Sequence, residues 1–424
     1  MSDNMRILWV TQNGGNYKNP TVTGTGGWIG AMQEAFCKRN PEVELGITFF
    51  HPFDNDDVSN DGVTYLPVEY DYGKTPLKKW IYRHSRNEEQ YLNERVLAMR
   101  DKVVSFHPDI VHIWGVEDKH AQLISYLTDI PSVVHIQGFA SACLFSYFAP
   151  GFSVESLKSA DKYLDRVFFK RGETFEYRGF VSRAERETKL APKVKNWIGR
   201  TEWDRTISML LSPSSRYFHC DELLRSSFTG NNWEYHYNGK ILNIQSTISY
   251  DWYKGMDIIL KTALVLKEIG VCVCWNIYGW EKENKKIGVF TKTLGINPND
   301  VGVYLKGCVD GSEIKNGLLS CDCYVHTSYI ENSSNAIAEA QLLGVPVIAQ
   351  NVGGTPTMLR DDSGMLVTPN DPYVMASKIL EITKQEISEF YSLNAKTLAK
   401  KRHNPDVVCG DLMNIYNTII KTAD

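Results

Sequence analysis

Short apolar runs alternate with amphipathic segments along the whole chain. In the first half the apolar runs predict strands over Arg6–Val10, Val43–Phe50, Asp109–Trp114 and Ser132–Gln137, followed later by the apolar run Lys193–Ile198. The amphipathic segments predict helices over Trp28–Cys37, Glu88–Val104 and Glu202–Leu211. The stretch Phe152–Leu190 is polar and predicted to be helical, whereas Ser212–Gly239 has no period and is expected to be irregular. This alternation is typical of parallel α/β domains.

The second half repeats the pattern more regularly. Its apolar runs predict strands over Ile241–Gln245, Val271–Tyr278, Val301–Leu305, Cys321–Thr327 and Val345–Ala349. The clearest helix is Met256–Ile269, whose apolar residues recur on one face. Between the halves, Phe228–Gly239 combines Gly, Asn and aromatic residues, so we place the domain boundary there.

Composition narrows the class of protein. With 424 residues, 43% hydrophobic and 23% charged, the chain is long enough for two or three ordered domains. A formal net charge of −4 gives no general attraction to nucleic acid. Nine cysteines, an odd number without a C-x-x-C pair, indicate buried free thiols in a reducing cytosol. No stretch resembles a signal peptide or reaches transmembrane length, so we expect a cytoplasmic protein that touches a membrane only peripherally, at its inner face.

The most informative segment is YIENSSNAIAEAQLLGVPVIAQNVGG, Tyr329–Gly354. Seven residues separate Glu331 from Glu339, and a helix is expected to begin near Ser333. The residues around that helix start are good N-caps or its first residues: Asn332, Ser333, Ser334 and Asn335. Free N–H groups and the positive end of the helix dipole would make this a diphosphate site beside Glu331. The alternative is two solvent-facing glutamates on an ordinary helix.

The same segment resembles the E-x7-E motif of retaining family-four glycosyltransferases (glycosyl transferases group 1). The resemblance implies the GT-B fold, in which two Rossmann-like, doubly wound parallel-sheet domains face a cleft. It assigns 1–235 to an acceptor-side domain, 236–400 to a nucleotide-sugar-binding domain, and 401–424 to a last helix that crosses back to the first domain. It also implies that Glu331 faces the donor sugar and that Glu339 binds the nucleotide ribose.

Two first-half motifs extend this resemblance. SVVHIQG (Ser132–Gly138) resembles the family strand whose histidine reaches the donor sugar, which gives His135 that role, whereas His112 is more often a core residue. TGTGGWIG (Thr23–Gly30) resembles the glycine-rich loop that places Gly26 and Gly27 against the diphosphate. A dinucleotide fingerprint fails here because the third glycine is replaced by Ile, which disfavours a nicotinamide-dependent dehydrogenase.

Lys254, in a Lys-Gly pair before the helix from Met256, resembles the lysine that neutralises the leaving diphosphate. The family normally adds an arginine after the preceding strand, but this chain has Gln245-Ser246 there. Arg200 and Arg205 are therefore candidate substitutes at the diphosphate, as is Lys306.

No cluster has metal-ligand spacing, and the Asp-x-Asp of FDNDD (Phe53–Asp57) is read as a solvated turn, so no metal and no cofactor are predicted. The basic, aromatic segment Lys74–Arg86 either docks on anionic lipid or is an ordinary exposed helix start. Phe139–Phe152 lines an acceptor pocket or fills core.

Together these features predict a hexosyltransferase that uses a nucleotide-sugar donor, with a UDP-sugar favoured and GDP-mannose second. The acceptor would be a glycan or lipid-linked saccharide in surface polysaccharide synthesis. A non-catalytic GT-B subunit that binds sugar nucleotide or glycan is the alternative.

Overall fold

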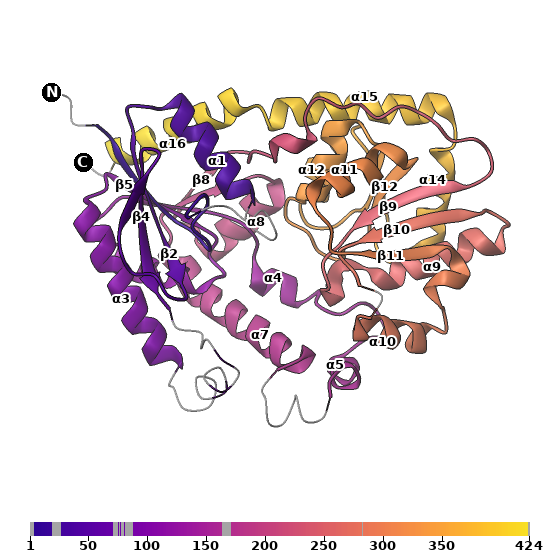
Figure 1. Ribbon diagram of the computed structural model, residues 1–424, viewed down its shortest axis with the longest axis horizontal. Coiled ribbons are helices and arrows are strands. Elements are labelled where there is room, and N and C mark those ends of the chain that lie inside the picture. Colours follow the sequence, from indigo (N-terminus) through magenta and orange to yellow (C-terminus); the bar gives the residue numbers. More distant parts are fainter. Residues whose placement is uncertain are drawn as a thin grey trace.

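The computed structural model describes residues 4–18, 27–70, 75, 77, 80, 88–162, 171–281 and 283–422. Two mainly parallel sheets, one from each half of the chain, form two α/β domains that lie side by side (Figure 1). The predicted fold class, two doubly wound parallel-sheet domains, is confirmed.

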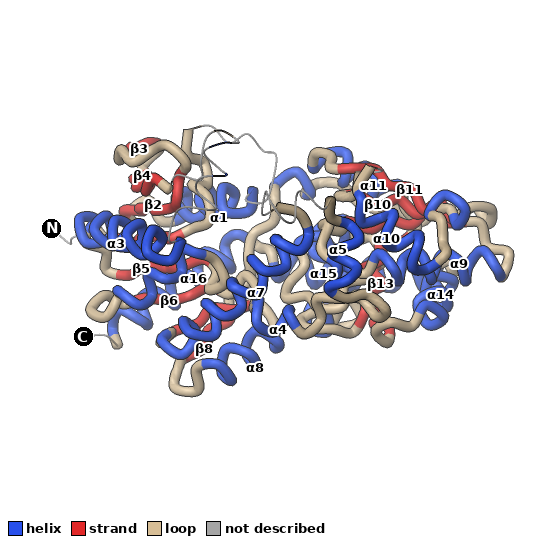
Figure 2. The backbone as a smooth tube through the Cα atoms, turned by 90° about the horizontal axis from the view of Figure 1, so that it is seen from below, coloured by secondary structure: helices blue, strands red, loops and turns tan. Residues whose placement is uncertain are grey.

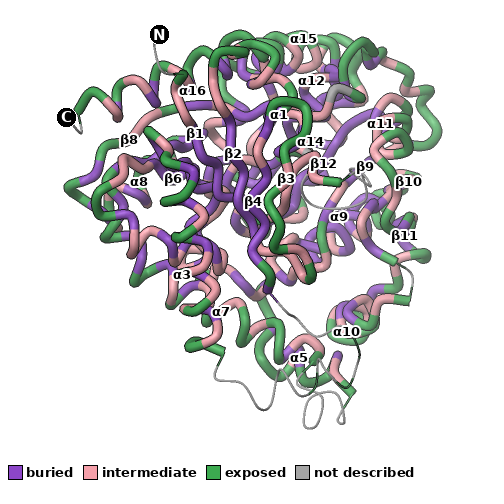
Figure 3. The backbone as a smooth tube through the Cα atoms, turned by 60° about the vertical axis from the view of Figure 1, so that its left-hand side comes forward, coloured by how far each residue is buried: buried purple, intermediate pink, exposed green. Residues whose placement is uncertain are grey.

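The first sheet has eight strands in the order β3-β4-β2-β1-β5-β6-β7-β8, and only the β3–β4 pair is antiparallel. The strands are β1 (Arg6–Val10), β2 (Glu44–His51), β3 (Val58–Asn60), β4 (Val63–Glu69), β5 (Ile110–Trp114), β6 (Ser132–His135), β7 (Asn196–Gly199) and β8 (Arg216–His219). Its central strands are largely buried, as the purple tube in Figure 3 shows.

The described helices of this half are α1 (Gly27–Arg39), α3 (Glu88–Phe106), η1 (Lys119–Tyr126), α4 (Ala140–Leu144), α5 (Val154–Ala160), α7 (Glu173–Leu190), η2 (Ala191–Lys193), α8 (Glu202–Leu211) and η3 (Ser226–Phe228). The expectation that Ser212–Gly239 is irregular throughout is wrong at β8. That strand lies at the sheet edge, where Ile198 pairs with Phe218. Its half-exposed residues give no continuous apolar run.

The second sheet has six parallel strands in the order β11-β10-β9-β12-β13-β14. They are β9 (Leu242–Thr247), β10 (Val273–Tyr278), β11 (Val303–Gly307), β12 (Cys323–His326), β13 (Val347–Gln350) and β14 (Met365–Val367). The helices are η4 (Trp252–Lys254), α9 (Met256–Glu268), α10 (Lys285–Leu294), η5 (Pro298–Val301), α11 (Gly311–Ser320), α12 (Asn335–Leu343), α13 (Thr355–Met358), α14 (Pro372–Glu381), α15 (Gln385–Arg402) and α16 (Pro405–Lys421).

The last two helices run along one side of both domains (Figure 1). Helix α16 packs against α1 and the first sheet, and Trp9 Nε1 donates a 3.0 Å hydrogen bond to the hydroxyl of Tyr416. The C-terminal helix therefore completes the core of the first domain.

A second crossing is formed by the segment after β6. Helix α5 lies against α10 of the second domain (Figure 2). Phe152 packs on Trp252 and Phe290, with ring centroids 5.9 and 4.6 Å away. Core filling therefore accounts for Phe152 in Phe139–Phe152, although Phe145 of the same segment is 95% exposed.

All nine cysteines are free thiols. Cys272 and Cys308 are exposed, which corrects the expectation of buried thiols, because one precedes β10 and the other follows β11. Among the described helices, none combines the length and apolar composition needed to cross a membrane.

Candidate active site

The loop between β12 and α12 carries Glu331, and Lys254 is the last residue of the short helix η4, just before α9. Lys254 Nζ donates a 2.8 Å hydrogen bond to Oε2 of Glu331. His326, the last residue of β12, places its Nε2 3.1 Å from the same oxygen, and Ser328 Oγ donates to it at 3.4 Å. The sequence interpretation did not select His326, although its place at the carboxyl end of a strand is the signal used for His135.

The ionic state of this pair follows from its contacts. Burial acts to raise the pKa of Glu331, but the charge of Lys254 and the contact with His326 outweigh burial and hold that pKa far below its usual range. Burial acts to lower the pKa of Lys254, but Glu331 more than offsets it and the pKa is raised. Both groups are therefore charged at neutral pH, and the pair offers one cation and one carboxylate at the same spot.

Two glycines allow the backbones around the pair to approach closely. A Cβ on Gly255 would lie 1.9 Å from the carbonyl oxygen of Thr327, and one on Gly353 would lie 2.0 Å from that of Glu331. Both glycines have positive φ angles, +79° and +52°. Thr327 Oγ1 also donates to the carbonyl of Lys254 at 2.9 Å. These contacts fix the two loops relative to each other.

Helix α12 begins at Asn335, two residues later than expected, and Ser334 is its N-cap. Ser334 Oγ accepts a hydrogen bond from the backbone N–H of Ile337 at 3.4 Å. Asn335 is exposed and Ser333 is half-buried. The helix start therefore lies beside Glu331, as the sequence predicted, while a diphosphate contact with Ser333, Ser334 or Asn335 stays a prediction.

Asn332 joins the two domains. Its Nδ2 donates to the carbonyl of Gln137 at 3.2 Å, and its Oδ1 accepts a 3.4 Å hydrogen bond from Thr201 Oγ1. Gln137 and Thr201 belong to the first domain, so this side chain holds the domain contact next to Glu331 in this conformation. A donor contact by Asn332 stays a prediction.

Glu339 lies inside α12 and is 4% exposed. Arg225, in the chain segment between the two sheets, donates to its Oε1 from Nε at 3.0 Å and from Nη2 at 2.6 Å. Burial raises the pKa of Glu339, and Arg225 opposes that rise. This burial excludes, for Glu339, the alternative interpretation of a solvent-facing glutamate on an ordinary helix. Sequence interpretation did not select Arg225, which lies in the stretch expected to be irregular.

His135 ends β6 and is fully buried. Its ring stacks on Trp114 at 4.5 Å and on His112 at 5.4 Å, and Nε2 lies 3.6 Å from Oε1 of Glu222. Burial holds the pKa of His135 well below its ordinary value, so the ring is neutral at physiological pH. His112 is likewise a core residue, whose Nδ1 lies 2.5 Å from the Tyr416 hydroxyl. The sugar contact of His135 stays a prediction.

The two arginines proposed for the diphosphate have other partners. Arg200 is buried, with Nη1 2.6 Å from Oε2 of Glu222 and Nη2 donating to the carbonyl of Ile136. Arg205 is exposed on α8 and pairs with Glu202 at 2.9 Å. Within the described residues, neither arginine contacts Lys254 or Glu331.

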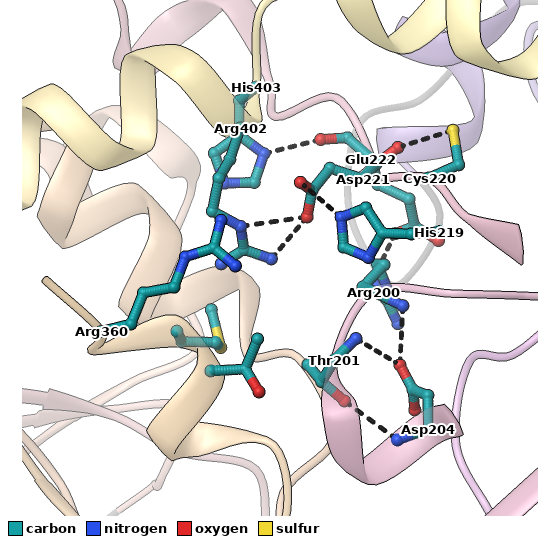
Figure 4. A network of polar contacts seen from close by, with 12 residues as sticks. Arg200, Thr201, Asp204, His219, Cys220, Asp221, Glu222, Arg360, Arg402 and His403 are labelled. Atoms are coloured by element: carbon teal, nitrogen blue, oxygen red, sulfur yellow. Dashed lines mark hydrogen bonds and ion pairs between the residues drawn. The ribbon is translucent and has the colours of Figure 1, made fainter. Parts of the chain in front are cut away.

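A polar network surrounds Arg200 (Figure 4). Glu222 accepts from Gln137 Nε2 at 2.5 Å, and its carbonyl lies 2.6 Å from Nδ1 of His403. Arg402 donates to Asp221 at 3.0 and 2.5 Å. The network therefore joins the end of α15 to Gln137, whose carbonyl accepts from Asn332.

The positions without the family arginine lie inside the second sheet. Ser246 is fully buried and donates from Oγ to the carbonyl of Val325 at 2.6 Å. Gln245 is 1% exposed and donates from Nε2 to the carbonyl of Ile314 at 3.2 Å. Neither position offers a cation.

Several predicted residues remain outside what the structure tests. Gly26 lies outside the described residues, and Gly27 is the first residue of α1. Lys74–Arg86 also lies outside them, apart from residues 75, 77 and 80. Lys306 is exposed on β11. In the described part of the chain, no group of three His, Cys, Asp or Glu residues could hold a metal ion, and the absence of a metal requirement stays a prediction.

Comparison with known proteins finds a family match for the segment that carries this site. Residues 240–385, which include Lys254, Glu331 and Glu339, match the family model described as Glycosyl transferases group 1. Over its whole length the chain is similar to a sucrose-phosphate synthase from Thermosynechococcus elongatus, with a TM-score of 0.69 at 12% identity, covering 99% of this chain and all of that one. The fold is GT-B.

Another structure of this fold is HepE of Anabaena in complex with UDP-glucose, with a TM-score of 0.59 at 15% identity, covering 98% of this chain and 100% of that one. Among curated sequences, the capsular polysaccharide biosynthesis glycosyltransferase CapM of Staphylococcus aureus is 28% identical over 192 residues, which are 44% of this chain and 49% of CapM. The chain spans about half the length of the first curated relatives it matches.

Proposed function

We propose that this chain is a retaining hexosyltransferase that uses a nucleotide-sugar donor, with a UDP-sugar favoured and GDP-mannose second. The observation that carries the proposal is the Lys254–Glu331 ion pair, whose two charged groups lie 2.8 Å apart. His326 also contacts Glu331, and all three residues lie within the segment that matches the glycosyltransferase family model. The acceptor is a glycan or a lipid-linked saccharide. CapM, a capsular polysaccharide glycosyltransferase, supports a role in surface polysaccharide synthesis.

In the proposed reaction, the bond between the anomeric carbon and the leaving phosphate oxygen breaks. The acceptor oxygen forms its bond to the same face of the sugar, and the acceptor proton passes to the leaving phosphate oxygen. Lys254 supplies positive charge where negative charge develops on the diphosphate. Glu331 accepts hydrogen bonds from sugar hydroxyls and thereby orients the ring. Nucleotide sugar is the substrate, and no cofactor or metal is part of the proposal.

A thermal-shift screen with UDP, GDP, ADP and their sugars tests the donor class. A ligand at about 100 times its dissociation constant adds about 2.7 kcal/mol of stability. Stabilisation by one nucleotide family and its sugars supports the proposal, whereas no stabilisation by any of them contradicts it.

A second candidate is a non-catalytic GT-B subunit that binds sugar nucleotide or glycan. The observation that favours it is the lack of a cation at Gln245 and Ser246, both of which are buried in the sheet. Stabilisation by a nucleotide sugar without hydrolysis or transfer would favour this candidate.

Membrane contact through Lys74–Arg86 is also part of the proposal. Its support is the basic and aromatic composition of the segment, together with the 66% exposure of Leu77. Such contact would bring the enzyme to a lipid-linked acceptor.

A further inference from the structure

The contact between Arg225 and Glu339 is a long-range ion pair that neither residue's local sequence requires. Arg225 comes from the segment between the sheets, and Glu339 lies inside α12, 114 residues later. Both donating nitrogens converge on one carboxylate oxygen, Oε1, at 3.0 and 2.6 Å. Within the described residues, the other oxygen, Oε2, has no hydrogen-bond partner. The carboxylate is therefore anchored on one side only.

Arg225 is itself held in place. Its guanidinium carbon lies 5.0 Å from the centre of the Phe228 ring, and Phe228 is fully buried in the core beneath α11 and α12. A Cβ on Gly311, the first residue of α11, would lie 3.0 Å from Nη1 of Arg225. The guanidinium thus lies between a buried ring and a helix start that has no side chain. These contacts fix the anchor on Oε1.

An ionised carboxylate oxygen only accepts hydrogen bonds. The side chain is only 4% exposed, yet Oε2 is not among the buried side-chain atoms that lack a partner, so a donor from outside the protein can reach this oxygen. Hydroxyl groups are neutral donors of the right kind, and a nucleoside carries a vicinal pair of them on its ribose.

We propose that Arg225 is a positioning residue of the nucleotide site, which anchors Oε1 of Glu339 and leaves Oε2 to accept a ribose hydroxyl. The inference rests on the proposed function, because it requires that the chain binds a nucleotide sugar. It differs from a competing role, in which a ribose would have to displace Arg225 from Glu339. The two roles predict opposite signs for the effect of removing the arginine on nucleotide affinity.

The protonation state of Glu339 distinguishes the positioning role of Arg225 from a merely structural role, because only the positioning role makes nucleotide affinity depend on pH. Burial raises the pKa of Glu339, and Arg225 opposes the rise. The charge of Glu339 also acts on the phenol of Tyr324 on β12, whose pKa is raised chiefly by burial. Without Arg225, Glu339 takes up a proton closer to neutral pH, and an uncharged carboxyl holds a hydroxyl less strongly.

The experiment measures the dissociation constant of bare UDP and GDP by calorimetry at about pH 6, 7 and 8, a range in which an unperturbed Glu stays ionised. The variants are Arg225→Met, Arg225→Lys, Glu339→Gln and the double variant Arg225→Met/Glu339→Gln. The control is Arg39→Met, which removes a different arginine–carboxylate pair, with Asp406, on the surface. Circular dichroism and melting temperature check that each variant folds.

Arg225→Met is expected to weaken the nucleotide by about tenfold at neutral pH, as for loss of a charge-assisted hydrogen bond, and further as the pH falls. Arg225→Lys restores part of the affinity. The double variant loses the additional pH dependence that Arg225→Met shows relative to wild type, and the control behaves as wild type.

Tighter or unchanged binding by Arg225→Met overturns the positioning role. A loss of nucleotide affinity that is the same at every pH and that Arg225→Lys does not restore also overturns it. If wild-type protein binds neither nucleotide, the proposed function fails and the inference falls with it, an outcome recognisable before any variant is compared.

Discussion

Lys254 and Glu331 form a hydrogen-bonded ion pair 2.8 Å long, although 77 residues separate them in sequence. Each follows a strand of the second sheet, β9 for the lysine and β12 for the glutamate, and these strands are neighbours. Ligands of open parallel sheets bind at the carboxyl ends of their strands. The pair therefore occupies the place where the fold itself favours a ligand.

The two glutamates should have separable roles. Glu339→Ala is expected to weaken bare nucleotide and nucleotide sugar alike, by roughly 1.5–3 kcal/mol, because it removes hydrogen bonds to a charged group. Glu331→Ala should change bare-nucleotide affinity little but lower transfer strongly, because the proposed role of Glu331 is to hold the sugar rather than the nucleotide. Calorimetric titration with parallel transfer rates checks this. Equal loss of nucleotide affinity in both variants would refute the division of roles.

Gly255 should tolerate no side chain. Gly255→Ala is expected to destabilise the protein by about 1–3 kcal/mol, because the new Cβ would lie 1.9 Å from the carbonyl oxygen of Thr327 at a φ of +79°. The matched control is Gly410→Ala in α16, where nothing lies within 4 Å of the added Cβ. That change should be neutral or stabilising by up to about 1 kcal/mol. Chemical denaturation of both variants gives the two values, and similar values would contradict the packing argument.

The sequence predicted elements best where local periodicity was strong. β1 and α8 have the predicted bounds, and α9 ends one residue early. The E-x7-E segment also located the loop of Glu331 and predicted a helix start near Ser333, two residues before its observed start at Asn335. These features depend on residues close in sequence, so their pattern carries the information.

Contacts between residues that lie far apart in sequence could not be predicted from local periodicity. Arg225 reaches Glu339 across 114 residues, and Asn332 reaches Gln137 across 195. Each contact depends on how the two sheets and their connection pack, which no local period encodes. For the same reason Arg200 was considered for the diphosphate, although it is buried against Glu222.

Burial of His112 should be visible in the acid stability. Burial lowers its pKa to about 3, whereas an unfolded histidine titrates near about 6.5. The unfolded chain therefore binds a proton on His112 before the folded chain does. The contribution of buried, neutral His112 to the free energy of unfolding is lost as the pH falls below about 6.5. His112→Asn removes this loss, so its melting temperature should approach that of wild type between about pH 6.5 and 5. A constant difference across this range would contradict the assignment.

The membrane proposal predicts salt-sensitive binding. Vesicles rich in anionic lipid should bind the protein at low ionic strength and release it as salt increases, because screening weakens charge attraction. Flotation of the variant that neutralises Lys74, Lys78, Lys79 and Arg83 should show weaker binding. Neutral vesicles serve as the control. Binding that is indifferent to both salt and these substitutions would remove the proposal.

The most direct test of the account is acceptor-dependent release of nucleoside diphosphate from the nucleotide sugar that the thermal-shift screen selects. Wild-type protein is expected to release it only with a glycan or lipid-linked saccharide acceptor. Lys254→Met should bind the donor yet react about 10²–10³-fold more slowly, as when one group that stabilises transition-state charge is removed. Wild-type protein that is stabilised by the nucleotide sugar but releases no diphosphate with any acceptor, or Lys254→Met that reacts at the wild-type rate, would contradict it.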